Sequence, residues 1–294
     1  MTTLRDIGED ALIERLIRLA PLSPGLAGPG DDCSVVDSGD SLQLLKTDAL
    51  VENIHFLPDA PARQVGWKAI ARVASDFAAM GGTPEHFLVT LALPSTLDVA
   101  WIEAFYQGMA DCLKTFGATL AGGETSGVPA GSAAVISIAA TGKVAKNHLT
   151  LRSTARPGDS ILVTGNLGGS LGGKHLTFTP RLREAAWLVR RFKPTAMMDL
   201  SDGLAKDLPR LAKASGTGFS INPEKIPRTP GSTLQQALGD GEDFELLFTL
   251  EEQNVPQLLS EWAAEFPDLP LNVIGKITAS AEGESLQGGW EHFR

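Results

Sequence analysis

Groups of acidic residues recur at six places in the chain, most of the acids beside glycine, serine or threonine, and such groups could bind metal ions and phosphates. They are Asp31 and Asp32 in "GPGDD", Asp48 in "KTD", Asp76 in "ASD", Glu124 in "GGET", Asp199 and Asp202 in "DLSD", and Glu242, Asp243 and Glu245 in "GEDFE". Mg2+ takes oxygen ligands and keeps several waters, so its sites combine a few carboxylates with substrate phosphates. The recurrence therefore predicts a site in which several bridging ions hold a polyphosphate.

The segment "MMDLSDGLAKDL", residues 197–208, raises the question of what such acids do. Apolar residues typical of a buried strand run into a predicted helix, and Asp199 and Asp202 flank Ser201 at the turn. One interpretation is helix capping, because an Asp before a helix usually accepts hydrogen bonds from unpaired backbone N–H groups. The other is metal binding. The number of similar clusters favours metal, although spacing alone does not show that the clusters meet in space.

A glycine-rich segment, "GGSLGGK" at residues 168–174, matches most of a nucleotide-binding P-loop. A P-loop needs Ser or Thr as the next residue to hold Mg2+, and this chain has His175 there. We therefore interpret the segment as a connection between elements. The sequence also shows no GxSxG nucleophile elbow and no Cys beside a His. We assign no covalent or acid–base catalytic residue.

Four other side chains have both a structural and a ligand-binding interpretation. His55, at a strand end, would accept a backbone hydrogen bond or contact a ligand. Arg152, after a polar link, would be solvated or bind phosphate as a fork. Phe116 closes a helical stripe and belongs to the core unless the helix end borders an adenine pocket. Residue type favours the structural interpretation for these three, whereas Trp290, after two glycines, would equally attach the tail or cover a ligand.

The overall charge narrows the class of partner. The chain has 294 residues, 43% of them hydrophobic, with a formal net charge of −10 and a pI near 5.0. This argues against nucleic acid as the main partner, since binding to nucleic acid depends on clustered Lys and Arg. It does not exclude a small phosphorylated ligand, which acids can bind through Mg2+.

Other sequence signals point to a cytoplasmic enzyme or binding protein. No uncharged apolar stretch reaches the length of about 18 residues that a membrane span requires. The charged, amphipathic N-terminal segment is not typical of a signal peptide. Cys33 and Cys112 lack the spacing of a disulfide framework or a zinc site.

The apolar patterns predict a two-domain α+β protein. In the first half we expect helices at 9–20, 63–82 and 97–117. We expect strands there at 33–37, 42–48, 86–94 and 133–144. Residues 119–127 are expected to form a glycine-rich turn. After a polar link we expect strands at 160–165, 195–200, 218–222, 243–250 and 271–278. We expect helices in this half at 183–192, 202–214 and 251–265. The link gives domains 1–145 and 146–294, and the irregular alternation fits α+β better than one doubly wound sheet.

Taken in order, the motifs resemble those of thiamine-monophosphate kinases, within the superfamily of aminoimidazole ribonucleotide synthetase. They are "GPGDD", "KTDALVENIHF", "ASDFAAMGG", "GGETS", "RSTARPGDSILVTGNLGGS", "MMDLSDGL" and "GEDFELLF". The resemblance implies transfer of the ATP γ-phosphate to the phosphate of thiamine monophosphate, giving thiamine diphosphate. It also implies the two-domain fold of that superfamily. The N-terminal domain would dimerise through its sheet to form a homodimer, and ATP and several Mg2+ would lie in the cleft between the domains.

The resemblance also implies roles for individual residues. The Mg2+ ligands would be Asp31, Asp32, Lys46, Thr47, Asp48, Asp76, Glu124, Asp199 and Asp202, with backbone and hydroxyl oxygens at Lys46 and Thr47. The ATP contacts would be Phe116, Gly123, Glu124, Arg152 and Ser201. The contacts to thiamine monophosphate would be His55, Glu242 and Trp290.

The chain departs from the family pattern at two metal positions. Glu124 stands where the family usually has Asp, so its carboxylate must reach the same ion with one more methylene. Lys46 stands where Ser or Thr is commoner and brings a cation near the metals. Both departures bear on the number of ions.

Two other functions stay open beside the kinase. An aminoimidazole ribonucleotide synthetase or selenophosphate synthetase would keep the fold and change the substrate. The latter needs a reactive N-terminal Cys or selenocysteine, which the sequence does not show. A non-catalytic nucleotide-binding protein would bind ATP and Mg2+ without turnover, and acids at every expected position argue against it.

Overall fold

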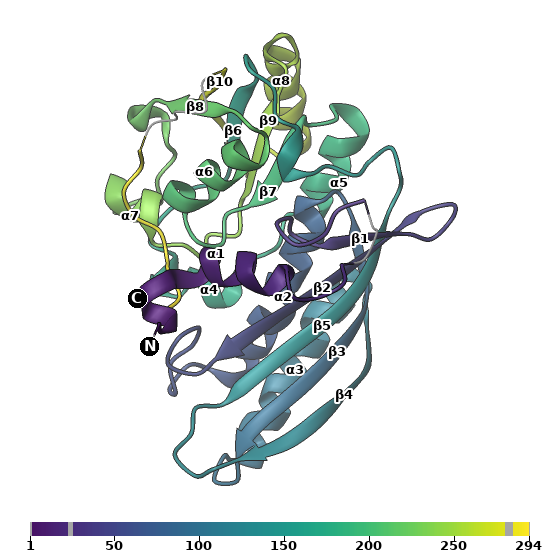
Figure 1. Ribbon diagram of the computed structural model, residues 1–294, viewed down its shortest axis with the longest axis vertical. Helices are drawn as coiled ribbons and strands as arrows, with labels where there is room; N and C mark the ends of the chain where they lie inside the picture. The colour runs from purple at the N-terminus through teal and green to yellow at the C-terminus, as the bar shows by residue number, and fades with distance from the viewer. Residues whose placement is uncertain (1, 23–25, 280–284, 294) are drawn as a thin grey trace.

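The computed structural model describes residues 2–22, 26–279 and 285–293, and it consists of two sheets with helices packed on them. Figure 1 shows the first sheet in the lower half of the view and the second sheet in the upper half. Helix α2 (Ala62–Ala79) contacts strands of both sheets and lies where the two halves meet. Within the described ranges, no helix is both long and apolar enough to cross a membrane.

The first half is built on a five-stranded sheet of order β1-β2-β5-β3-β4. Its elements are α1 (Leu4–Ile17), β1 (Ser34–Asp37), β2 (Leu42–Val51), α2 (Ala62–Ala79), β3 (Thr83–Pro94), α3 (Val99–Phe116), β4 (Thr119–Val128) and β5 (Val135–Val144). Neighbouring strands are antiparallel except β3 and β4, which are parallel and joined by α3. Helices α2 and α3 pack closely, because a Cβ at Gly66 or Gly108 would lie within 2 Å of a backbone oxygen of the other helix.

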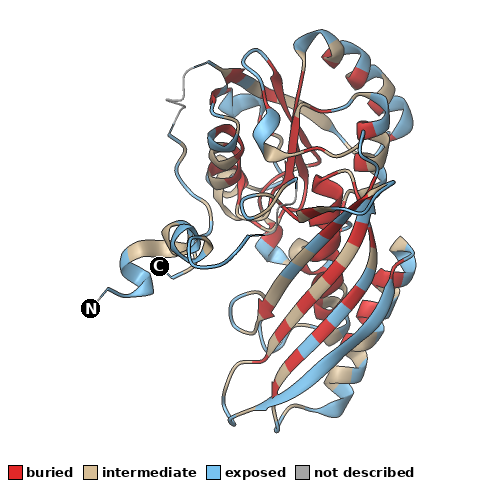
Figure 2. Cartoon of the chain, turned by 45° about the vertical axis from the view of Figure 1, so that its right-hand side comes forward, coloured by how far each residue is buried: buried red, intermediate tan, exposed pale blue. Residues whose placement is uncertain are grey.

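The two faces of this sheet differ. Alternate residues of β2 and β5 are buried toward α2, as the two-residue period of a strand requires. The opposite face leaves Leu45 38% exposed and Leu88 49% exposed. Figure 2 shows that edge strand β4 is exposed along nearly its whole length. The first sheet therefore presents an uncovered, partly apolar face.

The second half has another five-stranded sheet, of order β7-β9-β6-β10-β8, with antiparallel neighbours. Its strands are β6 (Ser160–Thr164), β7 (Ala196–Asp199), β8 (Gly218–Ile221), β9 (Leu246–Leu250) and β10 (Leu271–Thr278). Its helices are α4 (Lys174–Thr177), α5 (Leu182–Arg191), α6 (Leu204–Ala214), α7 (Leu234–Gly239) and α8 (Val255–Glu265). Short 3-10 turns are η1 (Arg152–Thr154), η2 (Ser170–Gly172), η3 (Pro223–Lys225) and η4 (Glu252–Asn254).

Both faces of the second sheet are covered. Along β6, Ile161 and Val163 join the core cluster that contains α6, whereas Leu162 joins the cluster that contains α5 and α8. Burial on both faces explains why this strand is a continuous apolar run. The mixed and antiparallel sheets with packed helices confirm the α+β class.

The helices and strands expected from the sequence all appear, with shifts at their ends, and one expected turn is wrong. Residues 119–127, predicted as a glycine-rich turn, belong to β4 (Thr119–Val128). The glycines permit this, because a Cβ at Gly123 would lie 2.1 Å from the carbonyl oxygen of Val89 on β3. Ladder hydrogen bonds to β3 outweigh the poor strand propensity of glycine.

Candidate metal and phosphate site

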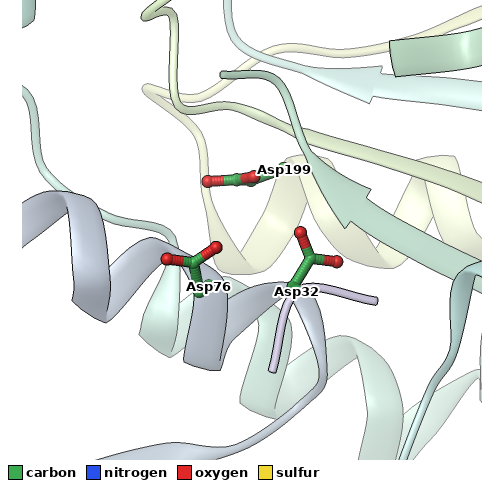
Figure 3. A group of neighbouring side chains, drawn as sticks. All are labelled: Asp32, Asp76 and Asp199. Carbon is green, nitrogen blue, oxygen red and sulfur yellow. The ribbon is translucent and has the colours of Figure 1, made fainter. Parts of the chain in front are cut away.

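Three buried aspartates meet at the junction of the two halves. Carboxylate oxygens of Asp32, Asp76 and Asp199 all lie within 4.8 Å of one another (Figure 3). Asp32 precedes β1, Asp76 lies near the end of α2, and Asp199 ends β7. The chain therefore has to fold both halves to assemble this group, which we call the three-aspartate cluster.

Helix α2 supplies both a carboxylate and a support for another. Ser75, next to Asp76, donates a hydrogen bond of 2.5 Å from its Oγ to Oδ2 of Asp199. The bond crosses the junction and fixes the carboxylate at the end of β7 against the helix. Sequence patterns did not single out Ser75.

Two basic side chains neutralise part of the cluster. Lys46 Nζ donates to Asp76 Oδ1 at 2.6 Å. Arg152 binds Asp32 as a fork through Nε and its terminal nitrogen, and its backbone N–H reaches Asp31 Oδ2 at 3.3 Å. The guanidinium is only 17% exposed, so the expectation of a solvated Arg152 is wrong.

Burial makes the carboxylates costly to ionise without a cation. It raises the pKa of Asp199 to about 6, and the charge of Asp32 adds to the increase. Burial also raises the pKa of Asp31 to about 6 and that of Asp76 above its usual range. An all-carboxylate donor set at this spacing fits a hard divalent cation such as Mg2+ rather than zinc.

Strand β2 divides its predicted ligands between its two faces. Lys46 and Asp48 point toward α2, and Asp48 pairs with Arg72 of α2 at 3.1 Å. Thr47 lies on the opposite face, where its hydroxyl donates to the carbonyl oxygen of Ile138 at 3.1 Å. Asp48 therefore lies beside the three-aspartate cluster, whereas the Thr47 hydroxyl points away from it.

The "DLSD" turn does not cap the helix that follows. Helix α6 begins after Gly203, and no side chain among the residues described caps it. The backbone N–H groups of Ser201 and Asp202 instead donate to Oδ2 of Asp207, at 3.1 and 3.0 Å. Asp202 pairs with Arg210 at 2.6 Å. The capping interpretation of Asp199 and Asp202 therefore lacks support, and Asp207 is the residue that shapes the turn.

A small hollow adjoins this turn. Its volume is about 180 Å³, and its lining includes His55, Arg72, Ser201, Asp202, Glu242 and Trp290. The backbone N–H of Trp290 donates to the carbonyl oxygen of Asp202 at 2.9 Å, so the tail is attached and its indole also lines the hollow. His55 Nδ1 accepts the Val51 N–H at 3.0 Å. The structural and ligand-binding interpretations are therefore compatible for both residues.

A buried lysine organises the far side of the hollow. Lys68 of α2 is fully buried, and its ammonium donates to the His55 carbonyl oxygen at 2.6 Å and to Glu242 Oε2 at 2.8 Å. Its Nζ also lies 2.7 Å from His175 Nδ1. Burial opposes ionisation of Glu242, but His175, Lys68 and Arg72 together lower the pKa of Glu242 to about 2.

Glu242 has two features typical of functional positions. Its φ of 52° is rare for a residue with a side chain, and such strain persists only where surrounding contacts impose it. Its buried Oε1 finds no hydrogen-bond partner among the residues described. A bound donor would satisfy that oxygen.

The "GGSLGGK" segment does not form a phosphate loop. Lys174 Nζ donates to the Asn166 carbonyl oxygen at 3.0 Å and lies 3.5 Å from Glu245, so it is turned toward its own half. The segment connects elements, as predicted. His175, the residue that breaks the P-loop pattern, lies beside Glu242.

Three predicted site residues lie away from the three-aspartate cluster. Gly123 and Glu124 lie on exposed edge strand β4, which β5 and β3 separate from β2. Three strand spacings make this about 14 Å. Phe116 packs against the core of the first half, with its ring centroid 6.2 Å from that of Trp67.

The sequence held one unused signal for the missed residues. Lys68, Arg72, Ser75 and Asp76 follow the i, i+4, i+7, i+8 spacing that puts residues on one helix face. All four lie on a helix otherwise buried by apolar residues. Polar residues in such a stripe indicate a buried polar site. Asp207 carried no comparable signal.

Family models match the two halves separately. Residues 30–144 match the AIR synthase related protein, N-terminal domain, and residues 156–286 match the AIR synthase related protein, C-terminal domain. A thiamine-monophosphate kinase of Synechococcus elongatus is 34% identical, over 99% of this chain and 98% of the relative. The chain belongs to the AIR synthase related family. Within that family it groups with the thiamine-monophosphate kinases.

Other members of this family support the same grouping. A thiamine-monophosphate kinase of Escherichia coli is 34% identical, over 94% of this chain and 92% of the relative. A solved structure described as AaThiL complexed with AMPPCP and TMP matches with a TM-score of 0.85 at 29% identity, over 99% of both chains. Thiamine monophosphate kinase from Aquifex aeolicus matches with a TM-score of 0.79. These likenesses cover both halves and the junction between them.

Proposed function

We propose that the protein is an ATP-dependent kinase that phosphorylates thiamine monophosphate to thiamine diphosphate. The observation that carries this proposal is the three-aspartate cluster, with the small, partly aromatic hollow of about 180 Å³ beside it. The names of its relatives and the ligands of the AaThiL structure point to the same donor and acceptor. Phosphoryl transfer requires positioning and cation charge more than covalent chemistry, which fits the absence of an assigned nucleophile.

Several Mg2+ ions would be held by Asp32, Asp76 and Asp199, with Asp31, Asp48 and Asp202 nearby. Bound Mg2+ would offset the repulsion between donor and acceptor phosphates and hold them in line. Arg152, now paired with Asp32, could turn its fork to a phosphate once a metal takes over that carboxylate. The cluster would thus exchange internal ion pairs for contacts to substrate.

The nucleotide would lie along a larger hollow that begins at the cluster. This hollow of about 760 Å³ runs from Asp31 and Asp32 past Thr47 onto the open sheet face, where Leu88 and Ala121 line it. Its acidic end would receive the phosphates through metal, and its apolar floor would receive the base. Thr47, which faces this hollow, would meet the nucleotide rather than the three-aspartate cluster.

The acceptor would lie in the smaller hollow. Trp290 would cover the aromatic rings of thiamine, since stacked rings gain contact area at a defined geometry. The unpartnered Oε1 of Glu242 would accept a hydrogen bond from the substrate's amino group. Burial lowers the pKa of His55 to about 4, so its ring would act as a neutral contact at pH 7.

A homodimer would complete the site. Gly123 and Glu124 lie on an exposed edge strand, too far from the cluster of their own chain to serve it. The same sheet has an uncovered face with exposed Leu45 and Leu88. A second copy packed on this sheet beside the nucleotide would cover the part of the face that the nucleotide leaves open and bring Glu124 toward the neighbouring site. Residues 1–145 would thus form the dimerisation and ATP domain, and residues 146–294 would complete the cleft.

The test is ADP release by purified protein with ATP, Mg2+ and thiamine monophosphate, with the product identified by chromatography. Free thiamine, and a reaction without acceptor, are the controls. Asp76→Asn should stay folded, with a lower melting temperature because Lys46 loses its charged partner, and should lose about 100-fold or more in turnover, because an electrostatic anchor of the transferring phosphate is lost. Thiamine diphosphate formation at the wild-type rate by this variant would contradict the proposal. ATP binding without product would point to another acceptor.

A further inference from the structure

Lys46 places a positively charged side chain among predicted metal ligands, where a lysine is unexpected. Its ammonium lies 2.6 Å from Asp76 Oδ1, inside the group of acids that would hold Mg2+. We propose that the Lys46 ammonium serves as a permanent cation of the phosphate site and takes the place of one divalent ion at Asp76. This inference rests on the proposed function and deepens it, because it concerns how the site is charged.

The backbone fixes where this ammonium can lie. Lys46 is in the middle of β2, where its Cα is in register with Ala140 of β5. The alternation along β2 directs its side chain toward α2, on the same face as Asp48. Its side chain is 22% exposed and that of Asp76 is 10% exposed. The pair is therefore shielded from water, and the lysine is directed into the site rather than resting on the surface.

The negative charges around the Lys46 ammonium stabilise it beside Asp76. Asp76, Asp48 and Asp32 face it, and each attracts the ammonium. Two of these acids already have other basic partners, since Arg152 pairs with Asp32 and Arg72 pairs with Asp48. Within the described part of the chain, Lys46 is thus the basic side chain that pairs with Asp76.

A divalent ion at Asp76 would compete with this ammonium. The ion would share a carboxylate with a group of like charge a few ångströms away, and such repulsion is strong where water is excluded. A lysine is also a donor only, so its Nζ offers no ligand while protonated. We therefore expect the site to bind one divalent ion fewer than its carboxylates could support.

The experiment counts Mn2+ ions bound per chain in the presence of AMPPCP, by electron paramagnetic resonance of the free ion. Lys46→Gln removes the charge and supplies an oxygen, and Lys46→Met removes the charge alone. Both should bind one more Mn2+ per chain than the wild type. The matched control is Lys143→Met, which breaks a lysine–carboxylate pair with Glu85 on the same domain, away from the cluster. It should leave the count unchanged.

Melting temperatures give a second readout that does not depend on turnover. In EDTA, Lys46→Met should melt below the wild type because Asp76 loses its cation, and Mn2+ should raise its melting temperature by more than that of the wild type. Equal Mn2+ counts in the wild type and both Lys46 variants would overturn the inference and leave the proposed function standing. No Mn2+ binding by any of the proteins would overturn both.

Discussion

Ser75 and Asp199 are joined by a 2.5 Å hydrogen bond that crosses from α2 to the end of β7. Both residues are buried, and each comes from a different half of the molecule. Because Asp76 follows Ser75 directly, the bond also fixes the separation of two predicted metal ligands. The junction between the halves and the geometry of the three-aspartate cluster are therefore one structural feature.

Ser75→Ala should weaken both the junction between the two halves and the three-aspartate cluster. Loss of a buried hydrogen bond to a charged group costs about 1.5–3 kcal/mol, which urea unfolding would measure as a lower midpoint. Turnover should fall while the KM for the acceptor changes little, since Ser75 touches metal ligands and not the smaller hollow. Ser38→Ala, which removes an exposed hydroxyl, is the matched control. Unchanged stability and turnover in Ser75→Ala would show that the bond is dispensable.

The buried Lys68 predicts a different pattern. Lys68→Met leaves Glu242 charged without its lysine partner, and breaking such a buried pair costs about 3–5 kcal/mol. The double variant Lys68→Met/Glu242→Gln should recover much of that stability, because the orphaned charge is removed as well. Its KM for thiamine monophosphate should still be raised, with the KM for ATP near the wild-type value. A double variant that binds the acceptor normally would contradict a positioning role for Lys68.

Much of this arrangement was predictable from the sequence, for physical reasons that differ between elements. The apolar run of β6 and the stripe of α2 follow from burial, which repeats at fixed periods. Strand β4 was missed because its glycines signal a turn locally, and only pairing with β3 makes them a strand. Local propensity is overridden there by tertiary hydrogen bonds.

Some site residues were likewise identified from sequence motifs, whereas others became apparent only in the fold. Motifs identified Asp32, Asp76 and Asp199, yet only the fold shows that they meet. Asp207 could not be found from spacing, because it acts through backbone N–H groups, whereas Ser75 stood in a polar helical stripe whose partner, Asp199, only the fold reveals. Positions that act on other residues, rather than on ligands, leave little trace in a single sequence.

The pH dependence of stability should carry a contribution from Asp243. Burial raises its pKa from 3.8 to about 7, against the hydrogen bond from the Gly168 N–H. Since the folded pKa is above the unfolded one, the stabilising contribution is complete below about pH 4 and is lost as the pH rises through 7.

Asp243→Asn removes this proton linkage and keeps an acceptor for Gly168. Its stability relative to the wild type should rise by up to about 1.4 kcal/mol per pH unit between pH 4 and 7, then level off. Urea unfolding at several pH values measures this difference. Asp268→Asn, at an exposed position of the same half, is the control. A difference between Asp243→Asn and wild type that does not vary with pH would contradict the assignment.

Glu124 supplies the sharpest test of the homodimer, because it lies on β4, three strands from the β2 residues of its own site. Glu124→Gln and Asp76→Asn should each inactivate a dimer that carries one change in both copies. A heterodimer of the two variants, co-expressed with different tags and purified through both, should keep one intact site and recover about half of the wild-type turnover. That intact site would combine Asp76 of one copy with Glu124 of the other. If Glu124 served its own chain, both sites of the heterodimer would be damaged and no turnover would return.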